Sequence, residues 1–163
     1  MKALGFEAPH WLGRKFSFTA TPPMKVWADC LAKGTLKLKP GFHTEPSTFQ
    51  DSCNFIRNAG LFRESRSLLA VVAANYREMN PHGNATYCCG NGGGQALMPE
   101  YKQAKLAALR AKAECIRATG ARMVVVGCHN CEDGILEAVK TYEVDAKVEL
   151  LSAYLAEAVD LDD

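Results

Sequence analysis

The spacing of the cysteines restricts the fold of this chain more than any other feature. Five of the seven cysteines form three separated groups: Cys53, the adjacent pair Cys88 and Cys89, and the two ends of the segment CHNC, Cys128 and Cys131. There are 34 residues between the first two groups and 38 residues between the last two. An odd number of cysteines with CC and CxxC spacing is not typical of a secreted disulfide scaffold, and it favours metal coordination in a reducing compartment.

Strand and helix patterns alternate along most of the chain. Apolar and β-branched runs predict strands, and apolar residues at helical spacing predict helices between them. Expected strands are 47–50, 85–87, 122–127 and 147–150, and expected helices are 24–33, 64–76, 99–118, 132–142 and 152–159. This alternation predicts an α/β fold with a mostly parallel sheet flanked by helices.

The first 45 residues differ from the rest, because they are rich in proline and carry a single predicted helix, which Gly34 would end. Residues 1–23 mix aromatic and polar side chains without a steady period, and we expect an irregular arm that needs a partner surface. The predicted organisation is an N-terminal arm with a short helix, 1–45, and a cysteine-rich domain, 46–163.

Each of the three cysteine groups follows a predicted strand, so the fold would bring them to one edge of the sheet. Thiolates select zinc, copper(I) or iron-sulfur clusters. The set of five exceeds the four ligands of structural zinc, which favours a polynuclear cluster, with a single structural zinc as the alternative. The predicted metal ligands are Cys53, Cys88, Cys89, Cys128 and Cys131.

Glycines follow the cysteine pair, at Gly90, Gly92 and Gly93. They allow the sharp bend that adjacent ligands require, and their N–H groups can stabilise an anionic cluster, so we assign them to cofactor binding. His129 is a candidate catalytic proton donor to a substrate sulfur, with a solvated loop histidine as the alternative.

Other polar and thiol side chains are weighed against structural roles. Asp51 could orient the first ligand loop, although a helix cap is the commoner role. The arginines at 57, 63 and 66 are expected on a solvated helix face, and Cys30 and Cys115 are expected to be core or surface thiols.

The charge balance and hydropathy exclude other classes of function. There are 19 basic and 18 acidic side chains, giving a net charge of +1, so nucleic-acid binding is not expected. No apolar run is long enough to span a bilayer, and the N-terminus lacks the apolar core of a secretory signal, which predicts a cytoplasmic location.

Taken in order, Cys53, Cys88-Cys89-Gly90 and Cys128-His129-Asn130-Cys131 resemble the CCG cysteine-rich domain of the heterodisulfide reductase family, in its B/D-like members. The segments TFQDSCNFIRNAGLFRESRSLL and CCGNGGG are most similar to catalytic iron-sulfur subunits of sulfate-reducer membrane redox complexes. The resemblance covers about 48–142. Ser52 replaces the usual proline before the first cysteine, and the second gap is slightly longer than usual.

The resemblance implies a Rossmann-like domain that holds a noncubane 4Fe-4S cluster through the five cysteines. It also implies an oxidoreductase subunit that transfers electrons to or from a thiol or disulfide substrate. Its partners would be other redox subunits, ferredoxin-like, flavin or membrane subunits, which would place it in the cytoplasm or peripheral to a membrane complex. No ferredoxin-like cluster motif is in this sequence, so electrons would come from another polypeptide, or the chain is a fragment.

Two alternatives remain open at this point. In one, a structural zinc makes the domain an assembly module. In the other, the cluster is a passive relay to a quinone or flavin partner.

Overall fold

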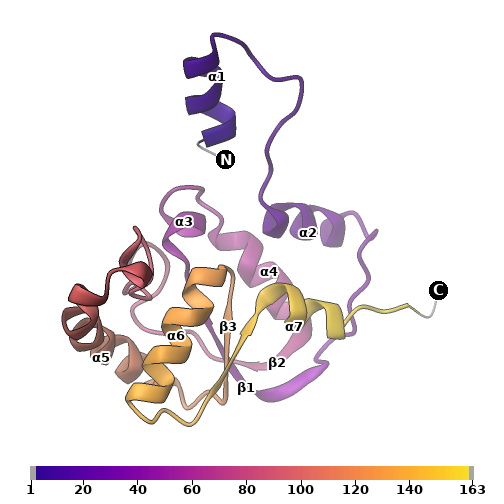
Figure 1. Ribbon diagram of the computed structural model, residues 1–163. Helices are drawn as coiled ribbons and strands as arrows, with labels where there is room; N and C mark the ends of the chain where they lie inside the picture. The colour runs from indigo at the N-terminus through magenta and orange to yellow at the C-terminus, as the bar shows by residue number, and fades with distance from the viewer. Residues whose placement is uncertain (1–2, 162–163) are drawn as a thin grey trace.

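A four-stranded parallel sheet forms the centre of the molecule in the computed structural model, which describes residues 3–161 (Figure 1). The spatial order is β2-β1-β3-β4, and every neighbouring pair is parallel. The strands are β1 (His43–Gln50), β2 (Ala73–Tyr76), β3 (Met123–Val126) and β4 (Lys147–Leu150). The expected α/β architecture with a parallel sheet is confirmed.

Helices cover both faces of the sheet because β3 is apolar on both sides. Met123 and Val125 contribute to one buried cluster, whereas Val124 and Val126 contribute to the other. The first cluster includes residues of α2 (Pro23–Ala32), α4 (Phe62–Val72) and α7 (Leu151–Glu157), and the second includes residues of α5 (Lys102–Thr119) and α6 (His129–Thr141). The short helix α3 (Cys53–Ile56) follows β1 directly.

Three predicted strands, 47–50, 122–127 and 147–150, correspond to β1, β3 and β4. The predicted helices 24–33, 99–118, 132–142 and 152–159 correspond to α2, α5, α6 and α7 with shifted ends. At 99–101 the chain is a 3-10 turn, and α6 begins earlier than predicted, at His129.

The strand predicted at 85–87 is wrong. Gly83–Ala85 is a 3-10 turn and the next residues are irregular. The fourth strand is instead β2, formed by the last four residues of the helix predicted at 64–76. Its pairing with β1 at the edge of the sheet decides this conformation, because nothing in the local sequence marks the change from helix to strand.

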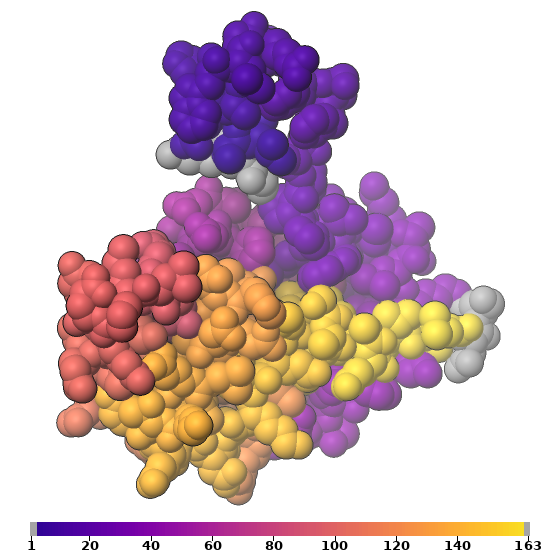
Figure 2. All heavy atoms as spheres, in the orientation of Figure 1, coloured from indigo at the N-terminus to yellow at the C-terminus, as the bar shows by residue number. Residues whose placement is uncertain are grey.

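The N-terminal arm is more regular than predicted. It contains a π-helical turn, η1 (Ala3–Glu7), and a short helix, α1 (Ala8–Leu12), which ends at the left-handed Gly13. Figure 2 shows this arm standing away from the body of the molecule, and the side chains of Phe6 and Trp11 are 70% and 75% exposed. Met24 of α2 is buried in the main core, and the domain boundary near residue 45 stays a prediction.

Within residues 3–161, no helix combines the length and apolar character that crossing a membrane requires.

Candidate metal centre

The first and third cysteine groups leave neighbouring strands at the same edge of the sheet. Gln50 at the end of β1 pairs with Val126 at the end of β3. Cys53 begins α3, three residues after Gln50, and Cys128 precedes α6, two residues after Val126. The parallel register therefore places both groups at the carboxyl ends of adjacent strands, as predicted.

The second cysteine group follows no strand, and side chains hold its loop in place instead. The carboxylate of Asp51 accepts a hydrogen bond from the backbone N–H of Gly83 at 2.6 Å. Arg57 donates to the carbonyl oxygens of Asn84 at 3.0 Å and Thr86 at 2.8 Å. These contacts draw the loop that leads to Cys88 across the end of β1.

A third contact extends this attachment to the residue before the cysteine pair. The side-chain amide of Gln50 donates to the carbonyl oxygens of Asp51 at 2.9 Å and Tyr87 at 3.4 Å. Gln50 is 1% exposed, so the last residue of β1 links the first cysteine group to the second from inside the protein. Neither Gln50 nor Arg57 was predicted to have this role.

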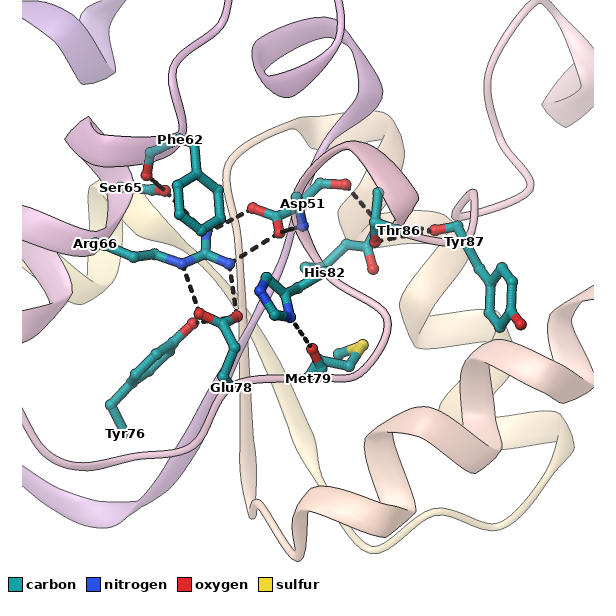
Figure 3. Close-up of polar contacts among 12 residues, drawn as sticks. Asp51, Phe62, Ser65, Arg66, Tyr76, Glu78, Met79, His82, Thr86 and Tyr87 are labelled. Atoms are coloured by element: carbon teal, nitrogen blue, oxygen red, sulfur yellow. Dashed lines mark hydrogen bonds and ion pairs between the residues drawn. The ribbon is translucent and has the colours of Figure 1, made fainter.

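Arg66 fixes the carboxylate of Asp51 (Figure 3). Its guanidinium donates to both oxygens of Asp51, at 2.6 and 2.8 Å, and to both oxygens of Glu78, at 2.6 and 3.0 Å. The same group lies 4.3 Å from the ring centre of Phe62. Burial opposes the charged form, but the hydrogen bonds to the two carboxylates outweigh it and raise the pKa of Arg66. The expectation of a solvated face is therefore wrong for Arg66.

Cys89 and Cys131 form a buried sulfur pair, and each is 3% exposed. A hydrogen bond from Cys131 lowers the pKa of the Cys89 thiol to about 6, although burial opposes this change. The hydrogen bond to Cys89 and burial both raise the pKa of Cys131, which keeps its proton. Within the pair, the negative charge is therefore favoured on Cys89 over Cys131.

Cys88 interacts with this pair through a hydrogen bond, and Cys128 acts on it through its charge. A hydrogen bond from Cys88 also lowers the pKa of Cys89, and the exposed Cys88 sulfur accepts the backbone N–H of Gly90 at 3.4 Å. The charge of Cys128 contributes to the raised pKa of Cys131. Three of the five predicted ligands, Cys88, Cys89 and Cys131, thus interact through hydrogen bonds, and they come from two loops far apart in sequence.

Cys53 is placed by the backbone and not by a sulfur contact. It is half-buried, and its neighbour Ser52 acts to lower the pKa of Cys131. Within residues 3–161, no three or more His, Cys, Asp or Glu side chains are grouped closely enough to hold a single metal ion. The five-ligand set stays a prediction.

The hydroxyl of Ser52 is a further polar group at this edge. It is buried, it acts on Cys131 by lowering the pKa of that thiol, and it has no other hydrogen-bond partner in the described chain. A hydroxyl in this position can donate to a sulfide or thiolate. Soft sulfur ligands beside a buried hydroxyl donor fit a sulfur-bound metal group.

Two glycines allow the cysteine pair to pack closely. A Cβ on Gly134 of α6 would overlap the carbonyl oxygen of Cys89 and lie 3.1 Å from its carbonyl carbon. Gly90 has a φ of +80°, and a Cβ there would lie 3.0 Å from a side-chain carbon of Lys105 in α5. The pair is therefore clamped between the two helices of one face.

The other glycines of the run show no such contact. A Cβ on Gly92 or Gly93 would meet no atom within 4 Å, and only Gly93 of these two has a positive φ, +61°. Their role in binding a cofactor stays a prediction.

His129 begins α6 and faces solvent. Its side chain is 78% exposed, and its Nδ1 lies 2.9 Å from a carboxylate oxygen of Glu132. This contact does not involve any of the sulfurs, and a catalytic role for His129 stays a prediction.

A cavity of about 1060 Å³ opens beside Cys128. One wall is formed by residues 20–23 of the arm, and the other includes Asn54, Phe55 and Arg57 after the first cysteine. A molecule in this cavity would reach Cys128 from solvent.

The comparisons with known proteins agree on the cysteine-rich part of the chain. A family model described as "CCG: Cysteine-rich domain" matches residues 47–135. A "Probable membrane-anchored ferredoxin" of Chromohalobacter salexigens is 31% identical over 109 residues, which are 67% of this chain and 16% of that protein. No solved structure matches.

A second relative matches along nearly the whole chain. It is one of the subunits of the dihydromethanophenazine:CoB–CoM heterodisulfide reductase of Methanosarcina mazei, 25% identical over 163 residues, which are 99% of this chain and 39% of that protein. The chain therefore spans less than half the length of either relative.

Proposed function

Because the chain belongs to the CCG cysteine-rich domain family, we propose that it is an iron-sulfur redox module whose five cysteines hold a noncubane 4Fe-4S cluster. The observation that carries this proposal is the buried contact between Cys89 and Cys131, with Cys88 beside it, which joins two loops far apart in sequence. Cys53 would supply the fifth sulfur from the adjacent strand end. Five thiolates exceed the four that a tetrahedral zinc accepts.

When bound, such a cluster would supply one-electron transfer to or from a thiol or disulfide. The residues of the chain would set its surroundings. Asp51 and Arg66 hold the second ligand loop, Ser52 offers a hydrogen bond to sulfur, and the cavity beside Cys128 gives a small sulfur compound access to the site.

The proposed partners are other redox subunits, which are ferredoxin-like, flavin-containing or membrane-bound. One relative is named as part of a heterodisulfide reductase and the other as a membrane-anchored ferredoxin, which supports a place in a larger redox complex at the membrane surface. The exposed aromatic side chains of Phe6 and Trp11 on the arm suit contact with such a partner.

The proposal is tested with anaerobically purified protein, reconstituted with iron and sulfide and then reduced. Absorbance and electron paramagnetic resonance are followed as thiols, disulfides or a quinone analogue are added. Oxidation of the reduced centre by a disulfide, at a rate that rises with disulfide concentration, is the expected result.

Two other results have clear meanings. Oxidation by the quinone but by no disulfide would replace the disulfide chemistry with a passive relay. A colourless protein that retains zinc through the reconstitution would favour the structural zinc module.

A further inference from the structure

Lys112 is a fully buried lysine on α5, with 0% exposure. Its Nζ donates to the hydroxyl of Thr86 at 3.2 Å and contacts the sulfur of Met79 at 3.4 Å. Neither partner is charged, and within residues 3–161 no carboxylate lies within salt-bridge distance of Nζ. A buried ammonium group without a nearby negative charge tends to lose its proton, so a nearby anionic centre would favour its charged form.

The surroundings of Lys112 identify where that charge comes from. Burial lowers the pKa of Lys112 to about 8, and the charges that oppose this effect belong to Cys115, Asp51, Cys131 and Cys89. Asp51 is already paired with Arg66. Cys115 is a thiol on the same helix and is not one of the proposed ligands. Cys89 and Cys131 belong to the proposed ligand set, so Lys112 lies within electrostatic range of the metal centre that this set would hold.

Lys112 is also tied to the cysteine pair through the backbone. Its partner Thr86 precedes Cys88 by two residues, and the carbonyl of Thr86 is held by Arg57. On the same helix, Leu109 packs against Gly90, directly after the pair. A cation at this point lies behind the second ligand loop, on the side away from solvent.

We propose that Lys112 is a positioning residue that provides the buried positive charge for the metal centre and stabilises its reduced form. This inference rests on the proposed function. The centre takes one electron from a one-electron donor, and the fixed ammonium group offsets the added negative charge without itself reacting. At an effective dielectric constant near 20, a unit charge within about one Debye length of such a centre changes this equilibrium by on the order of tenfold.

The test compares variants of the reconstituted chain by redox titration. Lys112→Met removes the charge but fills similar space, Lys112→Arg keeps the charge, and Lys102→Met removes an exposed charge from the same helix. Lys112→Met is expected to weaken reduction about tenfold, a midpoint potential about 59 mV more negative. The other two variants are expected to stay within about threefold of the unmodified protein.

Each remaining outcome decides the question. An unchanged potential in Lys112→Met overturns the inference. If Lys112→Met fails to assemble the centre and Lys112→Arg assembles it, the charge is required and the inference stands. If both variants fail although they fold, charge alone is not what the site needs, and the inference is wrong. If the unmodified chain itself binds no iron-sulfur centre, the proposed function fails instead.

Discussion

Replacing Gly134 by alanine tests the packing that brings the two ligand loops together. Gly134 lies one turn after Cys131 on α6, and an added Cβ would overlap the carbonyl oxygen of Cys89. The helix α6 cannot shift away from the loop, because the neighbouring side chains Ile135 and Ala138 are fully buried in the core. The loop that carries Cys89 must therefore move away by about 1 Å.

The magnitude follows from two opposing effects. Overpacking of this kind costs about 1–3 kcal/mol, whereas alanine in place of glycine within a helix gains about 1 kcal/mol. We expect a net destabilisation of the unloaded protein of about 0–2 kcal/mol. The effect on the metal centre should be larger, because ligands must stay within about 0.5 Å of their working geometry.

The assay is the iron and sulfide content after anaerobic reconstitution, with thermal unfolding of the unloaded protein measured in parallel. Gly5→Ala is the matched control, because it also adds a Cβ to a glycine in a helical turn, where the Cβ meets no atom within 4 Å and the φ is not in the left-handed region. Gly134→Ala should lose most of its iron while Gly5→Ala keeps it. If Gly134→Ala binds iron as fully as the unmodified protein, with the same spectrum, the close approach of the two loops is not required.

Three further predictions concern the surroundings of the site. Arg66→Met leaves the buried carboxylate of Asp51 without its ion pair. The free energy of unfolding measured by urea titration should fall by about 3–5 kcal/mol, and a loss under about 1 kcal/mol would contradict this. Cys128→Ala should lower the iron content whereas Cys115→Ala should not, and equal losses would place the ligands elsewhere. In the unloaded protein at pH 7.5, iodoacetamide should alkylate the exposed Cys88 well before Cys131, whose pKa is raised by its hydrogen bond to a neighbouring thiolate and by burial, as peptide mass spectrometry can check.

Much of the framework could be predicted from local sequence. The run Met123–Val126 is buried on both faces, as its uniform apolar character indicated. The long helix α5 ends at Gly120, where glycine adopts the left-handed conformation. The spacing of the CC and CxxC groups predicted that Cys89 and Cys131 would lie close together, because packing alone is an improbable reason for cysteines at these spacings.

The position of the second ligand loop could not be predicted in the same way. Its location depends on hydrogen bonds that Asp51 accepts from, and Arg57 donates to, backbone groups about 30 residues away. Such contacts leave no periodic signal. The strand β2 was missed for a similar reason, because pairing with β1 decides it. The strand predicted at 85–87 is not formed, but the segment does lead to the second ligand loop, which hydrogen bonds and not a strand hold in place.

Two residues did leave a signal that could have been used. Gly134 is a glycine inside a helical pattern, which often marks a close approach of another backbone. Lys112 falls on the same helical stripe as Leu109, Ala113 and Ile116, where a solvated lysine would not be expected. A polar residue within an apolar stripe is a useful indicator of a buried site.

The central claim is that sulfur ligands from three loops hold one polynuclear cluster, and metal analysis tests it most directly. Iron, acid-labile sulfide and zinc are measured on anaerobically reconstituted protein. We predict about four irons and about four sulfides per chain, with little zinc. About one zinc per chain, with no labile sulfide, would contradict the claim.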